Sequence, residues 1–303
     1  MAKIGVFDSG YGGLTILREI RKALPEYDYL YLGDNARAPY GTHSFDVIYR
    51  YTLQAVQYLI EQDCALIILA CNTASAKALR TIQQKDLLLI NGDAALNGGM
   101  MKRNVLGVIR PTVEAVPGIT KTGHVGILAT PATVSSESYV LELEKIFKST
   151  EHRIQNTDRI TITQQACPMW VPLIEAGEHK DEGADYFVEK YLREILAKDP
   201  QIDTLVLGCT HYPLLKEKIE RFADRIQTAN ADRTQTELPI QIIAQGDLVA
   251  KSLADYLKRH GEYREQLSQS GTCTYLTTEN AERFAQTASQ FIGSPVRAEH
   301  VSL

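Results

Sequence analysis

Two short apolar segments of the chain each end in a cysteine followed by polar residues. Residues 65–70 lead into Cys71, and residues 204–208 lead into Cys209. Apolar runs of this kind are typical of buried strands, and small or polar residues after them mark a corner where a site can open. A free thiol has a pKa of ~8.5, so thiol and thiolate are both accessible around neutral pH. The chain therefore carries two candidate acid/base groups in matching contexts.

Two such thiols suit the inversion of a carbon stereocentre. One base does not easily reach both faces of a carbon, so inversion needs one group that removes a proton and a second that returns one. Open α/β sheets bind ligands at the carboxyl ends of their strands. Two cysteines at strand ends in two halves of the chain would face each other across one cleft, with the substrate between them.

Three carboxylate or imidazole side chains are candidates to assist the thiols. Asp8 follows an apolar run in the same half as Cys71. His211 stands two residues beyond Cys209, and Glu175 is a possible carboxylate partner for this histidine. Other interpretations stay open: Asp8 could cap the next helix, His211 could lie at the surface, and Glu175 could be an exposed residue at a helix end.

The other cysteines, Cys64, Cys167 and Cys273, lack such surroundings and are expected to be small buried hydrophobic residues. Five cysteines are an odd number and widely spaced, so we expect no disulfide framework. No CxxC or HxxxH spacing indicates a zinc site. The sequence predicts no metal and no disulfides.

Composition restricts the class of protein. The chain has 303 residues, of which 44% are hydrophobic and 23% charged, which suits a soluble protein of roughly two domains. The net charge of -5 is not the positive charge typical of proteins that bind nucleic acid. No signal segment precedes Asp8, and the apolar runs are far shorter than the ~18 residues of a membrane span. We expect a cytoplasmic protein without nucleic-acid or membrane partners.

Strand-like and helix-like segments alternate from the start, as in doubly wound α/β domains. The first segments are strands at 4–7, 27–32 and 65–70 and helices at 14–24, 45–61 and 74–83. Amides of the glycine-rich turn 8–13 can hold an anion. Its spacing is neither GxGxxG nor GxxxxGK[ST], which favours a carboxylate cradle over a phosphate loop. The polar segment 33–41 is either a binding loop or a simple β-to-α connection.

The second half repeats this order. Its segments are an apolar run at 105–109, strands at 125–130, 160–164 and 204–207, and helices at 136–147 and 183–197. Each half thus has an early strand with a polar turn and a later strand with a cysteine, which indicates an internal duplication. Residues 91–104 are predicted to be a loop or insertion. Later elements, including a strand at 240–244 and another at 273–277, are expected to complete the first sheet.

We therefore predict two doubly wound, pseudo-symmetric α/β domains that face each other across a central cleft. The first domain would be discontinuous, with residues 1–104 plus 214–303. The second would comprise residues 105–213.

The motifs together resemble the bacterial glutamate racemase family. They are Asp8-Ser9-Gly10 with Gly12-Gly13, the segment 33–41, Ala70-Cys71-Asn72-Thr73-Ala74-Ser75, Gly107-Val108-Ile109, Gly126-Ile127-Leu128-Ala129-Thr130 and Gly208-Cys209-Thr210-His211-Tyr212-Pro213. The similarity runs from residue 4 to about 215. Segments 88–104 and 244–247 depart from the family pattern.

The resemblance implies a cofactor-independent enzyme that interconverts L- and D-glutamate and supplies D-glutamate for peptidoglycan. Cys71 would deprotonate D-glutamate with help from Asp8, and Cys209 would deprotonate L-glutamate with help from Glu175 and His211. A homodimer is implied as well. The implied substrate contacts are Asp8, Ser9, Tyr40, Gly41, Asn72, Thr73, Thr210 and His211.

Three other functions compete with this one. An aspartate racemase of the same superfamily would share the paired cysteines. A cysteine hydrolase could use Cys209 with His211 as base, but it would leave Cys71 idle, and the spacing of two residues is awkward for a thiol-imidazole contact. A periplasmic-type binding protein has two α/β halves, but the matched thiols argue against it.

Overall fold

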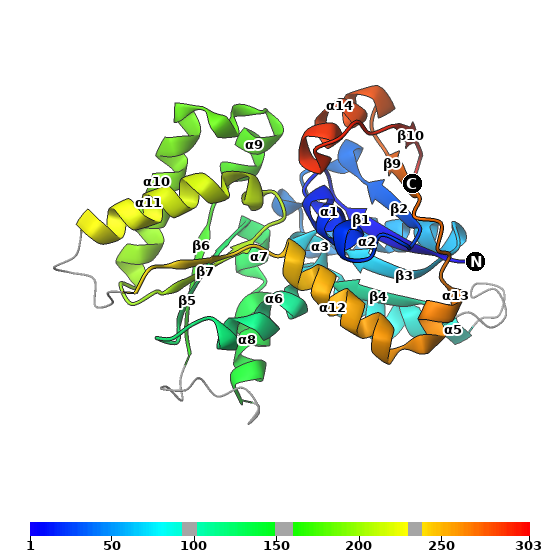
Figure 1. Ribbon diagram of the computed structural model, residues 1–303, viewed down its shortest axis with the longest axis horizontal. Coiled ribbons are helices and arrows are strands. Elements are labelled where there is room, and N and C mark those ends of the chain that lie inside the picture. The colour runs from blue at the N-terminus through cyan, green and yellow to red at the C-terminus, as the bar shows by residue number, and fades with distance from the viewer. Residues whose placement is uncertain (93–101, 149–159, 230–237) are drawn as a thin grey trace. The chain divides into compact units, whose positions relative to one another are not determined.

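The computed structural model describes residues 1–92, 102–148, 160–229 and 238–303 and divides the chain into two compact units (Figure 1). The first unit joins Met1–Val108 to Gly246–Leu303, and the second is Ile109–Gln245. Each unit has a parallel sheet with helices, which confirms the predicted α/β class.

The sheet of the first unit has six strands in the order β10-β9-β2-β1-β3-β4, all paired in parallel. The strands are β1 (Lys3–Asp8), β2 (Tyr29–Gly33), β3 (Cys64–Leu69), β4 (Asn104–Gly107), β9 (Cys273–Thr277) and β10 (Ala298–His300). Every residue of β2 and β3 is buried, as expected for strands covered by helices on both faces.

The helices of the first unit connect these parallel strands. They are α1 (Gly13–Ala23), α2 (Phe45–Glu61), α3 (Asn72–Lys77), α4 (Leu79–Thr81), α5 (Leu87–Gly92), α12 (Gly246–Arg259), α13 (Gly261–Gln266) and α14 (Ala281–Ile292), with short turns η1 (Asn35–Arg37), η2 (Tyr40–Thr42) and η3 (Ile82–Asp86). Helix α2 has the predicted bounds, and its buried residues include Ile48, Thr52, Ala55 and Leu59. This spacing of three and four residues is that of an amphipathic helix.

The second unit has a sheet of four parallel strands in the order β6-β5-β7-β8. The strands are β5 (His124–Ala129), β6 (Thr161–Ala166), β7 (Thr204–Gly208) and β8 (Gln241–Ile243). Its helices are α6 (Ile109–Ala115), α7 (Pro131–Ser135), α8 (Ser138–Lys148), α9 (Trp170–Glu175), α10 (Glu182–Lys198) and α11 (Lys216–Ala229), with turns η4 (Val116–Gly118), η5 (Glu178–Lys180) and η6 (Tyr212–Leu215).

The two sheets repeat one topology. The order β2-β1-β3-β4 in the first unit corresponds to β6-β5-β7-β8 in the second. Cys71 follows β3 and Cys209 follows β7, so the two cysteines occupy equivalent places. This correspondence supports the internal duplication inferred from the sequence.

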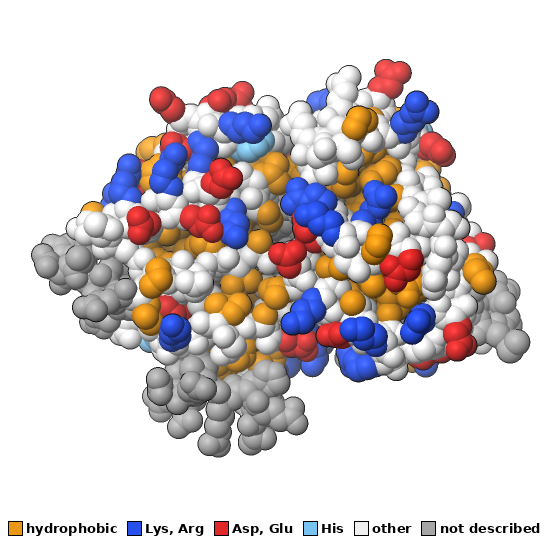
Figure 2. Space-filling model, in the orientation of Figure 1, with side chains coloured by type: hydrophobic (Ala, Val, Ile, Leu, Met, Phe, Trp, Pro, Cys, Tyr) orange, Lys and Arg blue, Asp and Glu red, His pale blue; other side chains and the backbone are white. Residues whose placement is uncertain are grey.

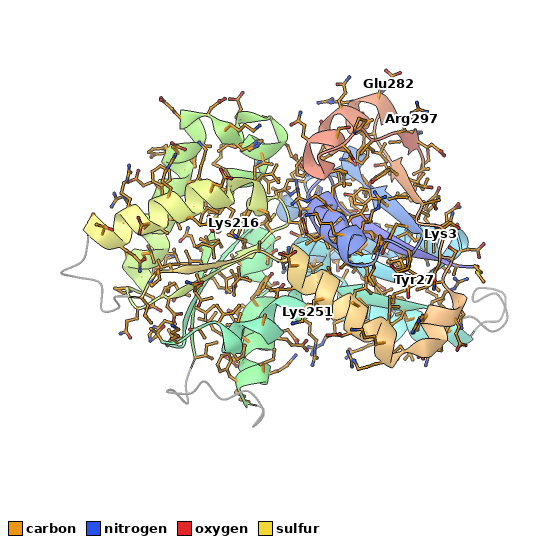
Figure 3. All side chains as sticks on the ribbon, viewed as in Figure 1. Lys3, Tyr27, Lys216, Lys251, Glu282 and Arg297 are labelled. Atoms are coloured by element: carbon orange, nitrogen blue, oxygen red, sulfur yellow. The ribbon has the colours of Figure 1, made fainter. Side chains whose placement is uncertain are left out.

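The predicted domain boundary at residue 214 was wrong. Strand β8 pairs with β7, with Val206 opposite Ile243, so it extends the second sheet and not the first. Helix α11, which begins at Lys216 (Figure 3), is tied to α10 by ion pairs such as Arg221–Asp185. The chain therefore returns to the first unit only at Gly246. Of the predicted loop 91–104, residues 93–101 lie outside the described residues.

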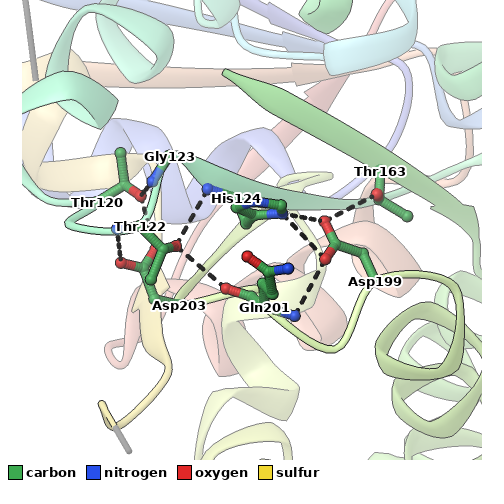
Figure 4. Close-up of polar contacts among 8 residues, drawn as sticks. All are labelled: Thr120, Thr122, Gly123, His124, Thr163, Asp199, Gln201 and Asp203. Carbon is green, nitrogen blue, oxygen red and sulfur yellow. Dashed lines mark hydrogen bonds and ion pairs between the residues drawn. The ribbon is translucent and has the colours of Figure 1, made fainter. Parts of the chain in front are cut away.

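Buried carboxylates fix the amino-terminal edge of the second sheet (Figure 4). The Asp199 carboxylate lies 2.9 Å from Nδ1 of His124, the first residue of β5. Asp203 accepts hydrogen bonds from Thr120 Oγ1 at 2.7 Å and from the Thr122 amide at 2.8 Å. These contacts hold the turn before β5 to the segment before β7, at the strand ends opposite to Cys209.

A similar carboxylate offers a test of stability in the first unit. Burial alone would raise the pKa of Asp28, but hydrogen bonds from Thr272, Ser268 and Ser270 lower it to about 2. We expect Asp28→Asn to lower the free energy of unfolding by about 1–3 kcal/mol, because buried donors lose their acceptor.

The pH dependence of this effect follows from the lowered pKa. The contribution of a carboxylate with a lowered pKa is complete above its unfolded value of 3.8 and is lost as the pH falls through about 2. The difference between parent and Asp28→Asn in urea unfolding should therefore shrink as the pH falls from 5 toward 2. A difference that stays constant over this range would contradict the assignment.

On the face shown in Figure 2, basic and acidic side chains are interspersed. Within the described ranges, no helix combines the length and the apolar character needed to cross a membrane.

Candidate active site

The first half-site forms where β1 and β3 end side by side. The two strands are parallel neighbours, and the Ala70 amide donates to the Phe7 carbonyl at 2.7 Å. This pairing brings the residues that follow β1 next to Cys71. Ser9 Oγ lies 3.3 Å from Cys71 Sγ.

Cys71 also caps the first turn of α3. Its Sγ accepts a hydrogen bond from the Ala74 amide at 3.4 Å, and its side chain is 5% exposed. An amide aimed at sulfur favours negative charge there, as at other helix N-termini. Asn72 and Thr73, the next two predicted contacts, are buried in the same turn.

Asp8 is not a helix cap, contrary to one of the alternatives left open by the sequence. Helix α1 has Gly12 as its N-cap, without a side-chain hydrogen bond, and Asp8 Oδ2 instead accepts from the Gly10 amide at 2.9 Å. A Cβ at Gly13 would lie 2.6 Å from Asp8 Cβ and 2.9 Å from Ala70 Cβ. Glycine is therefore needed where the turn packs against the strand ends, and Asp8 is held in that contact.

The polar segment after β2 carries Tyr40 and Gly41. Tyr40 is 1% exposed, and its hydroxyl donates to Asp34 Oδ2 at 2.5 Å. Burial and the neighbouring Asp34 carboxylate raise the pKa of Tyr40 far above its usual value, so the phenol stays protonated. The Tyr40 hydroxyl is thus committed to Asp34.

The second half-site forms after β7. The Cys209 Sγ lies 3.8 Å from His211 Nδ1, and His211 Nε2 lies 3.0 Å from Glu175 Oε1. Cys209 and His211 are each 6% exposed, and Thr210 between them is 3% exposed. The structure therefore brings together thiol, imidazole and carboxylate in one chain of contacts.

These contacts revise three expectations. His211 is buried, so the alternative of a surface histidine was wrong. Glu175 is the last residue of α9 but is paired with that histidine. The spacing of two residues, expected to be awkward for this contact, does bring the imidazole to the Cys209 thiol, because the chain turns directly into η6.

Opposing effects act on the protonation of His211. Burial alone would lower its pKa, but hydrogen bonds to Cys209 and Glu175 raise the pKa to about 10. The imidazole is therefore protonated at neutral pH. A protonated ring donates from both nitrogens, one toward sulfur and one toward the carboxylate.

An aromatic pair holds α9 against this corner. The Trp170 ring, at the start of α9, meets the Tyr212 ring edge-on with centroids 4.7 Å apart. The Tyr212 hydroxyl donates to the Cys167 carbonyl at 3.2 Å. Since Tyr212 follows His211 and Trp170 shares a helix with Glu175, this packing fixes the register of the imidazole and the carboxylate.

Thr130, which directly follows β5, and Thr133, in the first turn of α7, were not among the predicted site residues. Strand β5 is the parallel neighbour of β7, with Ala129 opposite Gly208, so Thr130 follows one strand where Cys209 follows the other. Thr130 Oγ1 donates to Thr133 Oγ1 at 3.0 Å. The matching place in the first unit, after β1, is that of Asp8 and Ser9, and this correspondence could have identified the threonines.

The remaining cysteines lack comparable partners. Burial raises the pKa of Cys64 to about 12 and raises that of Cys167 and of the half-buried Cys273. Cys64 and Cys167 are fully buried, as expected for small hydrophobic residues. Among the residues that the structure describes, no three His, Cys, Asp or Glu side chains converge as a metal-binding group.

Comparison with known proteins adds independent findings. A model of the Asp/Glu/hydantoin racemase family matches residues 4–231. The glutamate racemase of Geobacter metallireducens is 34% identical over 96% of this chain and 92% of its own. That of a Ruegeria species is 36% identical over 98% of each chain.

Solved structures are similar over the whole chain. A glutamate racemase isoform from Bacillus anthracis aligns with 100% of this chain and 98% of its own, with a TM-score of 0.80 and 28% identity. The glutamate racemase of Francisella tularensis, solved in complex with D-glutamate, aligns with 99% of this chain and 97% of its own, with a TM-score of 0.76 and 30% identity.

Proposed function

The chain belongs to the Asp/Glu/hydantoin racemase family and is therefore an isomerase, and we propose that its reaction is the interconversion of L- and D-glutamate. The observation that carries the proposal is the repeated placement of Cys71 and Cys209 after equivalent strands, each beside a polar partner. A two-base racemisation needs two such groups.

In the proposed reaction, one cysteine is a thiolate and the other a thiol. The thiolate removes the α-proton from one face of glutamate, and the electron pair of the C–H bond remains on the α-carbon. The opposite thiol then gives its proton to that carbon from the other face. Cys71 would act on D-glutamate and Cys209 on L-glutamate, and one turnover exchanges the protonation states of the two thiols.

The surrounding groups have distinct parts in this proposal. A protonated His211, held by Glu175, would donate to the sulfur of Cys209, while Asp8 would assist on the side of Cys71. Hydroxyl and amide groups of Ser9, Asn72, Thr73 and Thr210 would bind the substrate carboxylates. Because its hydroxyl is bonded to Asp34, Tyr40 would contact substrate through its backbone, as would Gly41.

The two thiols would suffice without a metal or a pyridoxal cofactor. We also propose that the enzyme works in the cytoplasm as a homodimer and supplies D-glutamate for peptidoglycan, as the family resemblance implies. On the first unit, exposed apolar side chains at Phe45, Leu88 and Leu89 offer surface that a second copy could cover.

The direct test is α-hydrogen exchange in heavy water. The purified enzyme, treated with a chelator and given no cofactor, should convert either pure enantiomer of glutamate to the racemate and incorporate deuterium at the α-carbon. Circular dichroism follows inversion, and proton NMR follows exchange. Racemisation of aspartate with glutamate left untouched would replace the proposed substrate, and inactivity toward both would reject the proposal.

A further inference from the structure

The corner at the end of β9, formed by Thr277 and Thr278, belongs to the C-terminal segment that returns to the first unit. It lies beyond residue 231, where the match to the family model ends. Strand β9 pairs with β2, with Thr277 opposite Gly33, so this corner is beside the start of the segment that carries Tyr40 and Gly41. Helix α14, with Glu282 in its first turn (Figure 3), follows the corner.

Both threonines bond to the segment after β2. Thr278 Oγ1 donates to Asp34 Oδ1 at 2.9 Å and accepts from the Ala36 amide at 3.0 Å. The Thr278 amide donates to the Gly33 carbonyl at 3.1 Å. Thr277 Oγ1 donates to the Asn35 side chain at 3.1 Å. Thr278 thus holds both the side chain and the backbone of this segment.

The Asp34 carboxylate extends these contacts toward Tyr40. Asp34 is 0% exposed, and its second oxygen, Oδ2, accepts from the Tyr40 hydroxyl at 2.5 Å and from Arg37 Nε at 2.6 Å. The Asp34 amide donates to the Asp8 carbonyl at 3.0 Å. One buried carboxylate therefore joins the C-terminal corner to the segment at the first half-site.

We propose that Thr278 is a positioning residue for substrate binding, acting through Asp34 on the backbone of Tyr40 and Gly41. The proposal rests on the function proposed above. The segment 34–43 has only two short turns of regular structure, η1 and η2, so side-chain contacts largely decide its conformation. Loss of the Thr278 hydroxyl would remove one hydrogen-bond donor from the buried Asp34 carboxylate, so the segment 34–43 would be held less firmly. Small displacements of binding groups reduce activity markedly.

Thr278→Val tests this proposal, because valine keeps the shape of threonine and removes the hydroxyl. We expect KM for glutamate to rise about tenfold with kcat changed less than about threefold, since binding groups move and the thiols do not. Thr278→Ser keeps the hydroxyl and should restore KM to near the parent value.

Thr120→Val is the matched control. The Thr120 hydroxyl also donates to a buried aspartate, Asp203, but at the amino-terminal edge of the second sheet. A purely structural role predicts the same loss of thermal stability in both valine variants and an unchanged KM. Equal KM values for Thr278→Val, Thr120→Val and the parent would overturn the proposal.

A second readout separates this proposal from the proposed function. Amide hydrogen exchange of peptides covering residues 34–43 should be faster in Thr278→Val than in the parent, whichever amino acid is the substrate. Unchanged exchange there would overturn the positioning role, whereas a parent enzyme inactive on glutamate would reject only the substrate. If Thr278→Val is not recovered folded, Thr278→Ala is measured in the same two ways, with the same expected and contradicting results.

Discussion

Replacing either Cys71 or Cys209 with serine is expected to lower glutamate racemisation by about 10²- to 10⁴-fold, the range that a positioned acid/base group contributes. Serine keeps the shape of the side chain, but its hydroxyl does not ionise near neutral pH. Each direction of the reaction uses both thiols, one as base and one as acid. Since the equilibrium constant of a racemisation is one, kcat/KM must fall by the same factor from L- and from D-glutamate.

The two variants should differ in a second measurement. In heavy water, Cys209→Ser retains the thiol that acts on D-glutamate, so it should exchange the α-hydrogen of D-glutamate without inverting it. Cys71→Ser should exchange only L-glutamate. Proton NMR of each enantiomer, with circular dichroism to follow inversion, assigns a face of the substrate to each cysteine.

Cys273→Ser is the control for these substitutions. It makes the same exchange of sulfur for oxygen at a half-buried thiol whose pKa is raised by burial. We expect its racemisation rate to stay within about twofold of the parent, because a cysteine with no acid/base role does not change the activation free energy of racemisation. If Cys71→Ser or Cys209→Ser were as active as Cys273→Ser, the two-base mechanism would be wrong.

The central elements could be predicted because their signals are local. All six residues of β3 and all five of β7 are buried, as expected for strands covered on both faces, and each strand leads to a cysteine corner. Helix α2 has a clear amphipathic pattern and was predicted with its observed bounds. The chemistry of the two corners followed from residue types that stand beside each other in the sequence.

Features that depend on pairing between distant segments were not predictable in this way. Strand β8 has three residues, and nothing in so short a run distinguishes a partner in one sheet from a partner in the other. The bond between Thr278 and Asp34 joins residues separated by 244 positions. The place of Thr130 beside the Cys209 corner became evident only once β5 was known to be the neighbour of β7.

The structure also shows how differently the two thiols are supported. Cys71 is held by the Ser9 hydroxyl and a backbone amide, which carry no net charge. Cys209 is beside an imidazole that is itself bonded to a carboxylate. The duplicated strands thus place the thiols equivalently, while unrelated connecting segments supply their partners. Substitution at His211 should therefore change the pH dependence of racemisation in a way that no change at Ser9 would reproduce.

His211→Asn is expected to lower kcat/KM for both enantiomers by about 10- to 10²-fold, less than loss of a thiol, because asparagine keeps one donor but no positive charge. In the parent, the His211 pKa of about 10 makes this histidine a cation over the neutral range. In the parent, the part of the activity that depends on this cation should decline as the pH rises through about 10. His211→Asn should lack this decline, which a pH profile of kcat/KM measures.

The raised pKa of His211 should also make the free energy of unfolding depend on pH. A folded-state pKa raised above the unfolded value of ~6.5 adds stability that is complete below pH ~6.5 and is lost as the pH rises to about 10. The difference in unfolding free energy between parent and His211→Asn should therefore narrow over this range. His124→Asn is the matched control, because it removes a histidine–carboxylate contact with Asp199 at the opposite edge of the same sheet. If His124→Asn reduced racemisation as much as His211→Asn, or if His211→Asn kept the alkaline decline of the parent, His211 would not be the proton donor that supports Cys209.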